Sequence, residues 1–286
     1  MIDVSISLEA TCDLEKEYIE QYDLSVIDMN FEVDGESFYT KTDDVVSSKL
    51  YEKMTQKKKT GTSQINDYAY EEFFRELLKK NKPVIHLALS SGLSGTVDGA
   101  RRVAEEINKT SENKIFVVDS LSGSSSQGLL GIVLREKASE LNKVEELVAF
   151  AEMFKHKMYH YFTVETLTYL ANGGRLDSKA AFFGNLLNIK PVMEMSKGGK
   201  LEVMHKVISR KKSISSIADL TVKAISEDSP YCFIAHANSE KDAELMKQKI
   251  ELGTKVKTII TNLGPVIGSH SGPGTLAVFF VGKNDR

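Results

Sequence analysis

Short apolar runs alternate with amphipathic stretches through the first half of the chain. Residues 84–89 and 115–118 are apolar at nearly every position, which is typical of parallel strands buried on both faces. Three stretches around them repeat apolar residues at intervals of three and four, as the buried faces of helices do. Their apolar positions are Tyr70, Phe73, Phe74, Leu77 and Leu78, then Ala100, Val103, Ala104 and Ile107, then Val144, Leu147, Val148, Ala151 and Phe154. This alternation predicts an open, parallel α/β sheet.

The pattern changes near residue 158, where a β-rich run over residues 158–164 begins. A helix is expected over residues 178–188, with Asp177 or Ser178 as its cap and Pro191 after its end. One side of this helix carries Phe182, Phe183, Leu186 and Leu187. Two strands over residues 191–195 and 201–205 follow, and the glycines of the turn between them predict a hairpin.

The remaining elements are mixed in type. We expect a helix over residues 214–225, a strand over 232–237, a helix from Ser239 with Asp242 at the capping-box position, and strands over 256–261 and 276–281. Hairpins combined with helices predict a mixed sheet, unlike the first half. We therefore expect two domains: a parallel-sheet α/β domain over residues 1–158 and a mixed-sheet α/β domain over residues 159–286.

Composition narrows the class of protein. The chain has 286 residues, 41% hydrophobic and 27% charged, which describes a globular protein of about two domains. A net charge of −3 gives no general attraction to nucleic acid or to an anionic membrane. There is neither an apolar run long enough to span a bilayer nor a signal-peptide pattern at Met1. Cys12 and Cys232 are expected to be buried thiols in a reducing cytoplasm.

A serine- and glycine-rich turn joins the first apolar run to a helix. Residues 89–96 read L-S-S-G-L-S-G-T. Free backbone N–H groups, short hydroxyls and the positive end of a helix dipole would meet there, which favours an anion such as a phosphate or a carboxylate. The alternative is an ordinary strand-to-helix loop, in which serine caps the helix and glycine permits the tight turn.

Three more segments are rich in polar residues and glycine: residues 60–64, which predict a polar turn before a helix, residues 172–175, and residues 264–274. Each is weak alone, because turns use glycine and proline for dihedral reasons. Arg175 is either a surface residue near a helix start or a functional cation. His270, which lies between glycine-rich stretches, is either structural or part of a site.

Three enzyme classes fit the sequence poorly. A serine hydrolase would use Ser91 or Ser94 with His270 and Asp119, but Gly92-Leu93-Ser94-Gly95 is not a nucleophile elbow. Neither the dinucleotide-binding nor the P-loop glycine motif occurs. The six histidines are dispersed; His156 and His160 are four residues apart without an acidic companion, and we interpret them as a surface pair rather than a metal site.

Taken together, the motifs resemble the DegV family, which includes the fatty acid-binding subunits of bacterial fatty acid kinase. The resemblance covers essentially the whole chain, in order. It is carried by residues 9–14 (E-A-T-C-D-L, for D-S-T-A-D-L), 62–64 (T-S-Q), 89–96, 118–120 (V-D-S), 170–175 (L-A-N-G-G-R), 186–191 (L-L-N-I-K-P) and 264–274 (G-P-V-I-G-S-H-S-G-P-G).

The resemblance implies a three-layer α/β/α domain with a parallel sheet and a two-layer α/β domain with a mixed sheet. A long-chain fatty acid would lie in a tunnel between them, with no other cofactor and no metal. The helix over 178–188 would line this tunnel or pack into the core. The carboxylate would be bound by Thr62, Ser91, Gly92, Ser94, His270 and Arg175.

The resemblance also implies partners and location. The chain would present the acyl group to a separate ATP-using kinase subunit, which makes the acyl phosphate, and would not itself be catalytic. We expect a cytoplasmic bacterial protein with no stable membrane insertion, and we allow for a transient membrane contact. Departures from the family pattern are Glu9-Ala10, Gly61 and Ile65, which we expect around the mouth of the site.

Overall fold

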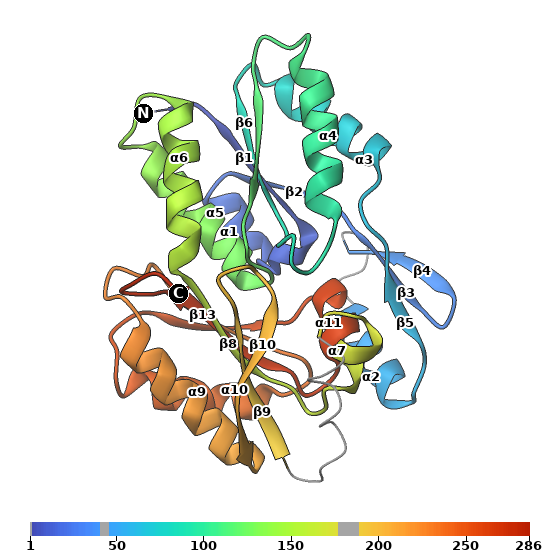
Figure 1. Cartoon of the computed structure of the whole chain (residues 1–286), viewed down its shortest axis with the longest axis vertical. Coiled ribbons are helices and arrows are strands. Elements are labelled where there is room, and N and C mark those ends of the chain that lie inside the picture. Colours follow the sequence, from blue (N-terminus) through green and yellow to red (C-terminus); the bar gives the residue numbers. More distant parts are fainter. Residues whose placement is uncertain (1, 41–45, 177–188) are drawn as a thin grey trace.

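The computed structural model describes residues 2–40, 46–176 and 189–286 (Figure 1). Two sheets lie one above the other in this view, with helices around them. The expected helix over residues 178–188 lies outside the described residues, together with its cap and its apolar side. None of the helices in the described ranges is long and apolar enough to cross a bilayer.

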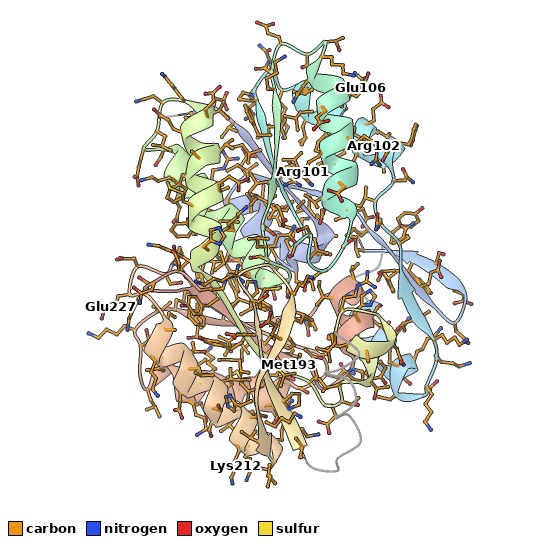
Figure 2. All side chains as sticks on the ribbon, viewed as in Figure 1. Arg101, Arg102, Glu106, Met193, Lys212 and Glu227 are labelled. Carbon is orange, nitrogen blue, oxygen red and sulfur yellow. The ribbon has the colours of Figure 1, made fainter. Side chains whose placement is uncertain are left out.

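The first sheet is entirely parallel, as predicted, with the strand order β2-β1-β6-β7. Its strands are β1 (Ser5–Glu9), β2 (Leu24–Ile27), β6 (Val84–Ala88) and β7 (Ile115–Asp119). Helices α3 (Asp67–Leu78) and α4 (Thr96–Asn108) cover one face, and α1 (Lys16–Gln21), α5 (Ser125–Ala138) and α6 (Val144–Phe154) cover the other. Figure 2 labels Arg101, Arg102 and Glu106 along α4, and all three are exposed.

The second sheet is mixed, with the order β10-β9-β8-β13-β11-β12. Its strands are β8 (Met158–Thr163), β9 (Ile189–Met195), β10 (Leu201–Ile208), β11 (Cys232–His236), β12 (Thr258–Asn262) and β13 (Leu276–Val281). Only β11 and β12 pair in parallel, and β9 and β10 form the predicted hairpin. Helices α9 (Arg210–Ala224) and α10 (Glu240–Glu251) pack on one face.

Helix α5 lies between the two sheets. Eleven of its fourteen residues are buried, and it contacts β1 and β6 of the parallel sheet as well as β8, β11 and β13 of the mixed sheet. One core cluster accordingly runs from Ile6 and Leu8 through Leu130 to Phe162 and Phe279. The fold is therefore a three-layer α/β/α unit stacked on a two-layer mixed-sheet unit. The boundary at residue 158 stays a prediction.

A small third sheet was not predicted. It has the order β4-β3-β5 and consists of β3 (Asn30–Val33), β4 (Glu36–Tyr39) and β5 (Thr60–Thr62). With α2 (Val46–Thr55) it packs against α11 (Pro265–Ser271), which in turn contacts α7 (Thr168–Asn172). Part of the expected polar turn at residues 60–64 is thus a strand, and the glycine-rich segment 264–274 contains a short helix. This packing brings the first half of the chain against the last helix.

Of two smaller predictions from the sequence, one is confirmed and one is wrong. Cys12 and Cys232 are buried and unpaired, as predicted. The capping box at Ser239 is wrong: no side chain caps α10, and the Asp242 carboxylate instead accepts a hydrogen bond from Arg210 Nε at 2.8 Å. An ion pair with a neighbouring helix has taken the carboxylate away from the local cap.

Candidate ligand-binding site

A cavity lies where the two sheets and the small sheet meet. The empty space inside it, counted out into the open solvent at its mouth, is about 910 Å³. Its wall is mainly apolar. The apolar lining residues are Met29, Leu89, Leu93, Phe162, Leu170, Met195, Leu201, Leu263, Val266, Ile267, Ala277 and Phe279. An apolar wall of this extent suits a hydrophobic ligand.

The serine- and glycine-rich turn contributes only part of its length to the cavity. Leu93 and Ser94 line it, and Ser94 Oγ accepts a hydrogen bond from the amide of Thr96 at 3.3 Å. Ser91 is exposed and is not among the lining residues, and its amide donates to Asp119 Oδ1 at 3.2 Å. Gly92 also stays outside the lining, because it lies against the backbone of Gly199 in the β9–β10 turn. The ligand roles of Ser91 and Gly92 stay predictions.

Thr62 and His270 meet at one end of the cavity, although they are 208 positions apart in the chain. Thr62 Oγ1 and His270 Nε2 are 2.8 Å apart, within hydrogen-bond distance, and both residues line the cavity. Burial, together with the nearby Arg175, lowers the pKa of His270 to about 4. The imidazole is therefore neutral at pH 7, and it acts through hydrogen bonds rather than through charge. Gly173 makes room for it, since a Cβ there would come within 2.5 Å of His270 Nδ1.

Arg175 supplies the positive charge at the same end. Its Nε donates to the carbonyl of Leu93 at 3.0 Å, and its Nη1 donates to the carbonyl of Gly173 at 2.5 Å. These bonds attach the segment after α7 to the serine- and glycine-rich turn. Among the described residues, no acidic side chain lines the cavity. The end formed by Thr62, His270, Arg175 and Ser94, hereafter the polar end, therefore suits an anionic group attached to an apolar body.

One buried carboxyl group does lie just behind the lining. Asp13 Oδ2 accepts a hydrogen bond from Ser124 Oγ at 2.6 Å, and Ser124 lines the cavity. Burial raises the pKa of Asp13 to about 7. A carboxyl that is substantially protonated near neutral pH repels an anionic ligand less than a full charge would. The sequence placed Asp13 in a motif but gave no sign of this burial.

Glu9 does not lie at the mouth of the cavity, contrary to expectation. Its side chain is fully buried beneath the turn, where Oε1 accepts from the Tyr70 hydroxyl at 2.6 Å and Oε2 accepts from the amide of Leu89 at 2.7 Å. Glu9 therefore holds the end of β6 from which the turn begins. Its effect on a ligand would be indirect, through the position of the turn.

His160 is a cavity residue, and the expected surface pair with His156 is wrong. The ring is only 2% exposed and lines the cavity beside Phe162 and Phe279. The spacing of four residues would matter on a helix, but His160 lies in β8, where alternate residues share a face. His160 therefore points to the same side as Met158 and Phe162, into the space between the sheets.

The geometry does not assemble a serine hydrolase. The Asp119 carboxylate accepts the amides of Ser91 and Leu121 rather than orienting His270. His270 meets Thr62 instead of a serine, and its charged neighbour Arg175 disfavours the imidazolium ion that a general base must form. Within the described ranges, no cluster of three or more acidic, histidine or cysteine side chains could hold a metal ion.

Comparisons with known proteins agree on one family. The family model described as "Uncharacterised protein, DegV family COG1307" matches residues 3–283. A DegV domain-containing protein of Clostridium perfringens is 33% identical over 281 residues, 97% of each chain. Solved structures similar to this chain include a fatty acid-binding DegV protein of Bacillus subtilis, with a TM-score of 0.84, 26% identity and coverage of 99% of this chain and 100% of that one. A DegV lipid-binding protein of Thermotoga maritima has a TM-score of 0.86 and 25% identity, with both chains fully covered.

Proposed function

Because this chain belongs to the DegV family, we propose that it binds one long-chain fatty acid in the cavity between its sheets. The carboxylate lies at the polar end, against Arg175, His270, Thr62 and Ser94, and the acyl chain follows the apolar wall. The observation that carries this proposal is that Arg175, the one Lys or Arg among the described lining residues, lies at one end of a cavity whose wall is mainly apolar. Fatty acid binding by similar DegV structures supports it.

The energetics fit such a ligand. Each buried methylene contributes about 0.8 kcal/mol, so the acyl chain supplies most of the affinity. Charge-assisted hydrogen bonds to a carboxylate are about twice as strong as neutral ones, so the polar end fixes the orientation of the ligand. The hydrogen-bonded pair of neutral His270 and Thr62 leaves one directional donor for the carboxylate without adding charge, because each group has a single hydrogen to donate.

We propose further that the protein presents this carboxylate to a separate ATP-using kinase and is not itself a catalyst. Thr62 and Arg175 are half-buried, and the residues beside them, Ser63 and Gln64, are exposed. A second protein can therefore reach the polar end from the surface. Ser91 and Gly92 stay part of this proposal as carboxylate-binding residues, although they lie outside the cavity lining, in the turn that contains Ser94. The unpaired cysteines support a cytoplasmic location, and the similar proteins named above come from bacteria.

The protein is expected to retain a fatty acid through purification, because an acyl chain in an apolar cavity leaves only slowly. Native mass spectrometry should show a bound mass in the fatty acid range, and organic extraction should release it. Delipidated protein should then take up one equivalent of stearate or oleate. Protein that yields no fatty acid and takes none up after delipidation would refute the proposed function.

Thr62→Val is expected to weaken fatty acid binding by roughly 10- to 150-fold, because a hydrogen bond to a charged group contributes about 1.5–3 kcal/mol. Titration calorimetry on delipidated protein measures the effect. Thr60→Val is the matched control: Thr60 lies in the same strand, but its hydroxyl donates to the carbonyl of Ser269 and does not line the cavity. Equal affinity in the two variants would place the carboxylate elsewhere.

A further inference from the structure

We propose that His160 forms a second polar position in the cavity, away from the carboxylate, and that it binds a hydroxyl group carried on the acyl chain. Hydroxylated long-chain fatty acids are then ligands that this protein favours over plain ones of equal length. The inference rests on the proposed function and adds a substrate class to it.

His160 is buried among apolar side chains with one ring nitrogen unused. Its ring lies edge-on to Phe279, with the ring centres 5.6 Å apart. Nε2 is fully buried and has no hydrogen-bond partner among the residues that the structure describes. An unpaired buried polar atom costs free energy, so it is rare unless something else satisfies it. Since His160 lines the cavity, a ligand can provide the missing partner.

The other edge of the ring is already occupied. Nδ1 lies 3.5 Å from Nη1 of Arg286, which leaves the Nε2 edge free. The Arg286 guanidinium donates to the carbonyls of Met195, Ser196, Leu121 and Lys155 at 3.2–3.4 Å. Arg286 is therefore held in place by the protein backbone, behind the residues that line the cavity.

The ring environment selects a neutral hydrogen-bonding group. Burial and the charge of Arg286 hold the pKa of His160 well below its usual range, so the ring is neutral. Because a guanidinium can only donate, Nδ1 accepts in its contact with Arg286, and the proton of the neutral ring lies on Nε2, which is therefore a donor. A hydroxyl oxygen on the acyl chain can accept this hydrogen bond without bringing a charge into the apolar part of the cavity, whereas a carboxylate there would lose its hydration at a much larger cost in free energy.

His160 lies away from the polar end. It contacts Arg286, at the chain terminus marked C in Figure 1, whereas Thr62, Arg175 and His270 belong to β5, to the segment after α7 and to α11, on the other side of the same view. Ser271 Oγ is also buried without a partner among the described residues, but it lies beside His270 and belongs to the polar end. A hydroxyl that reaches His160 must therefore sit along the acyl chain, not next to the carboxylate.

The test compares stearate with a series of hydroxystearates that carry the hydroxyl near the start, in the middle and at the end of the chain. Dissociation constants are measured on delipidated wild type, His160→Phe, His160→Gln and Phe162→Leu. We expect one isomer with a remote hydroxyl to bind wild type more tightly than stearate does. His160→Phe should weaken that isomer about tenfold relative to stearate, because the buried hydroxyl loses its partner.

The other variants separate polarity from shape. His160→Gln keeps a donor and an acceptor and should retain the preference. Phe162→Leu alters the same face of β8 without a polar change, so both ligands should shift together. Equal discrimination by wild type and His160→Phe would overturn the inference, as would a wild type that binds no isomer more tightly than stearate. Failure to bind stearate at all would instead overturn the proposed function. If His160→Phe does not fold, the wild-type series and His160→Gln decide.

Discussion

Arg175→Ala is expected to lower fatty acid affinity by roughly 10- to 150-fold and to lower acyl-phosphate formation by a partner kinase by a larger factor. Arg175 is the cation of the polar end, and on the proposed function it would meet the carboxylate in the bound state and the greater negative charge of the acyl phosphate as it forms. Hydrogen bonds to charged groups contribute about 1.5–3 kcal/mol, which sets the size of the binding effect. The turnover defect should persist at saturating fatty acid.

Three quantities are measured on Arg175→Ala: fatty acid affinity, melting temperature and kinase-coupled turnover. Arg175 also bonds the carbonyls of Leu93 and Gly173, so a purely structural role is a real alternative. In that case stability, binding and turnover would fall together. Arg175→Lys keeps the charge and should recover part of the turnover, while Arg101→Ala, on the exposed side of α4, is the surface control. Normal turnover in Arg175→Ala would remove Arg175 from the mechanism.

Gly199→Ala is expected to lower the melting temperature by about 5–10 °C and to weaken fatty acid binding. Gly199 has a φ of +70°, a backbone conformation that costs a residue with a side chain about 1–3 kcal/mol. A Cβ there would also collide with Ser90 Oγ, which donates to the Gly199 carbonyl at 2.8 Å. For a protein of this size each kcal/mol corresponds to about 2–4 °C. Binding suffers because Met195 and Leu201, on either side of this turn, form part of the cavity wall.

Gly198→Ala provides the matched control for this effect. Gly198 is the preceding residue of the same turn, but it is exposed, and a Cβ there would have open space around it. Its melting temperature and affinity should stay close to those of the wild type. Thermal unfolding and calorimetry on both variants give the comparison. Two equal decreases would mean that the turn tolerates no side chain at all, and that its contact with Ser90 is not the cause.

The sequence predicted the helices and strands that have a clear apolar pattern of their own. The apolar runs of β6 and β7 and the periodic faces of α3, α4 and α6 appear where expected, because each pattern specifies its own buried side. The small sheet escaped prediction because its strands are short: β5 has three residues, all half-buried, with no alternation to detect. Strand β5 of that sheet places Thr62 beside His270, so only the family resemblance could predict their contact.

The other errors share a physical cause. The sequence favours an exposed pair of His156 and His160 four residues apart, but the strand that contains His160 turns alternate residues to opposite faces and buries this one. Glu9 was expected at the mouth because it departs from the family motif, yet tertiary hydrogen bonds to Tyr70 and to the amide of Leu89 hold it beneath the turn. In both cases the environment of the side chain depends on segments far away in the chain.

Helix α5 resists any separation of the two sheets. It buries one side on the parallel sheet and the other on the mixed sheet, so neither sheet can leave without baring apolar helix surface to water. A hinge motion that separated the two sheets would expose this apolar surface along the helix, which costs free energy. On the proposed function, the acyl chain would therefore enter and leave past the side chains at the opening of the cavity while the layers stay together. For the same reason we expect the two sheets to unfold in one transition rather than one after the other.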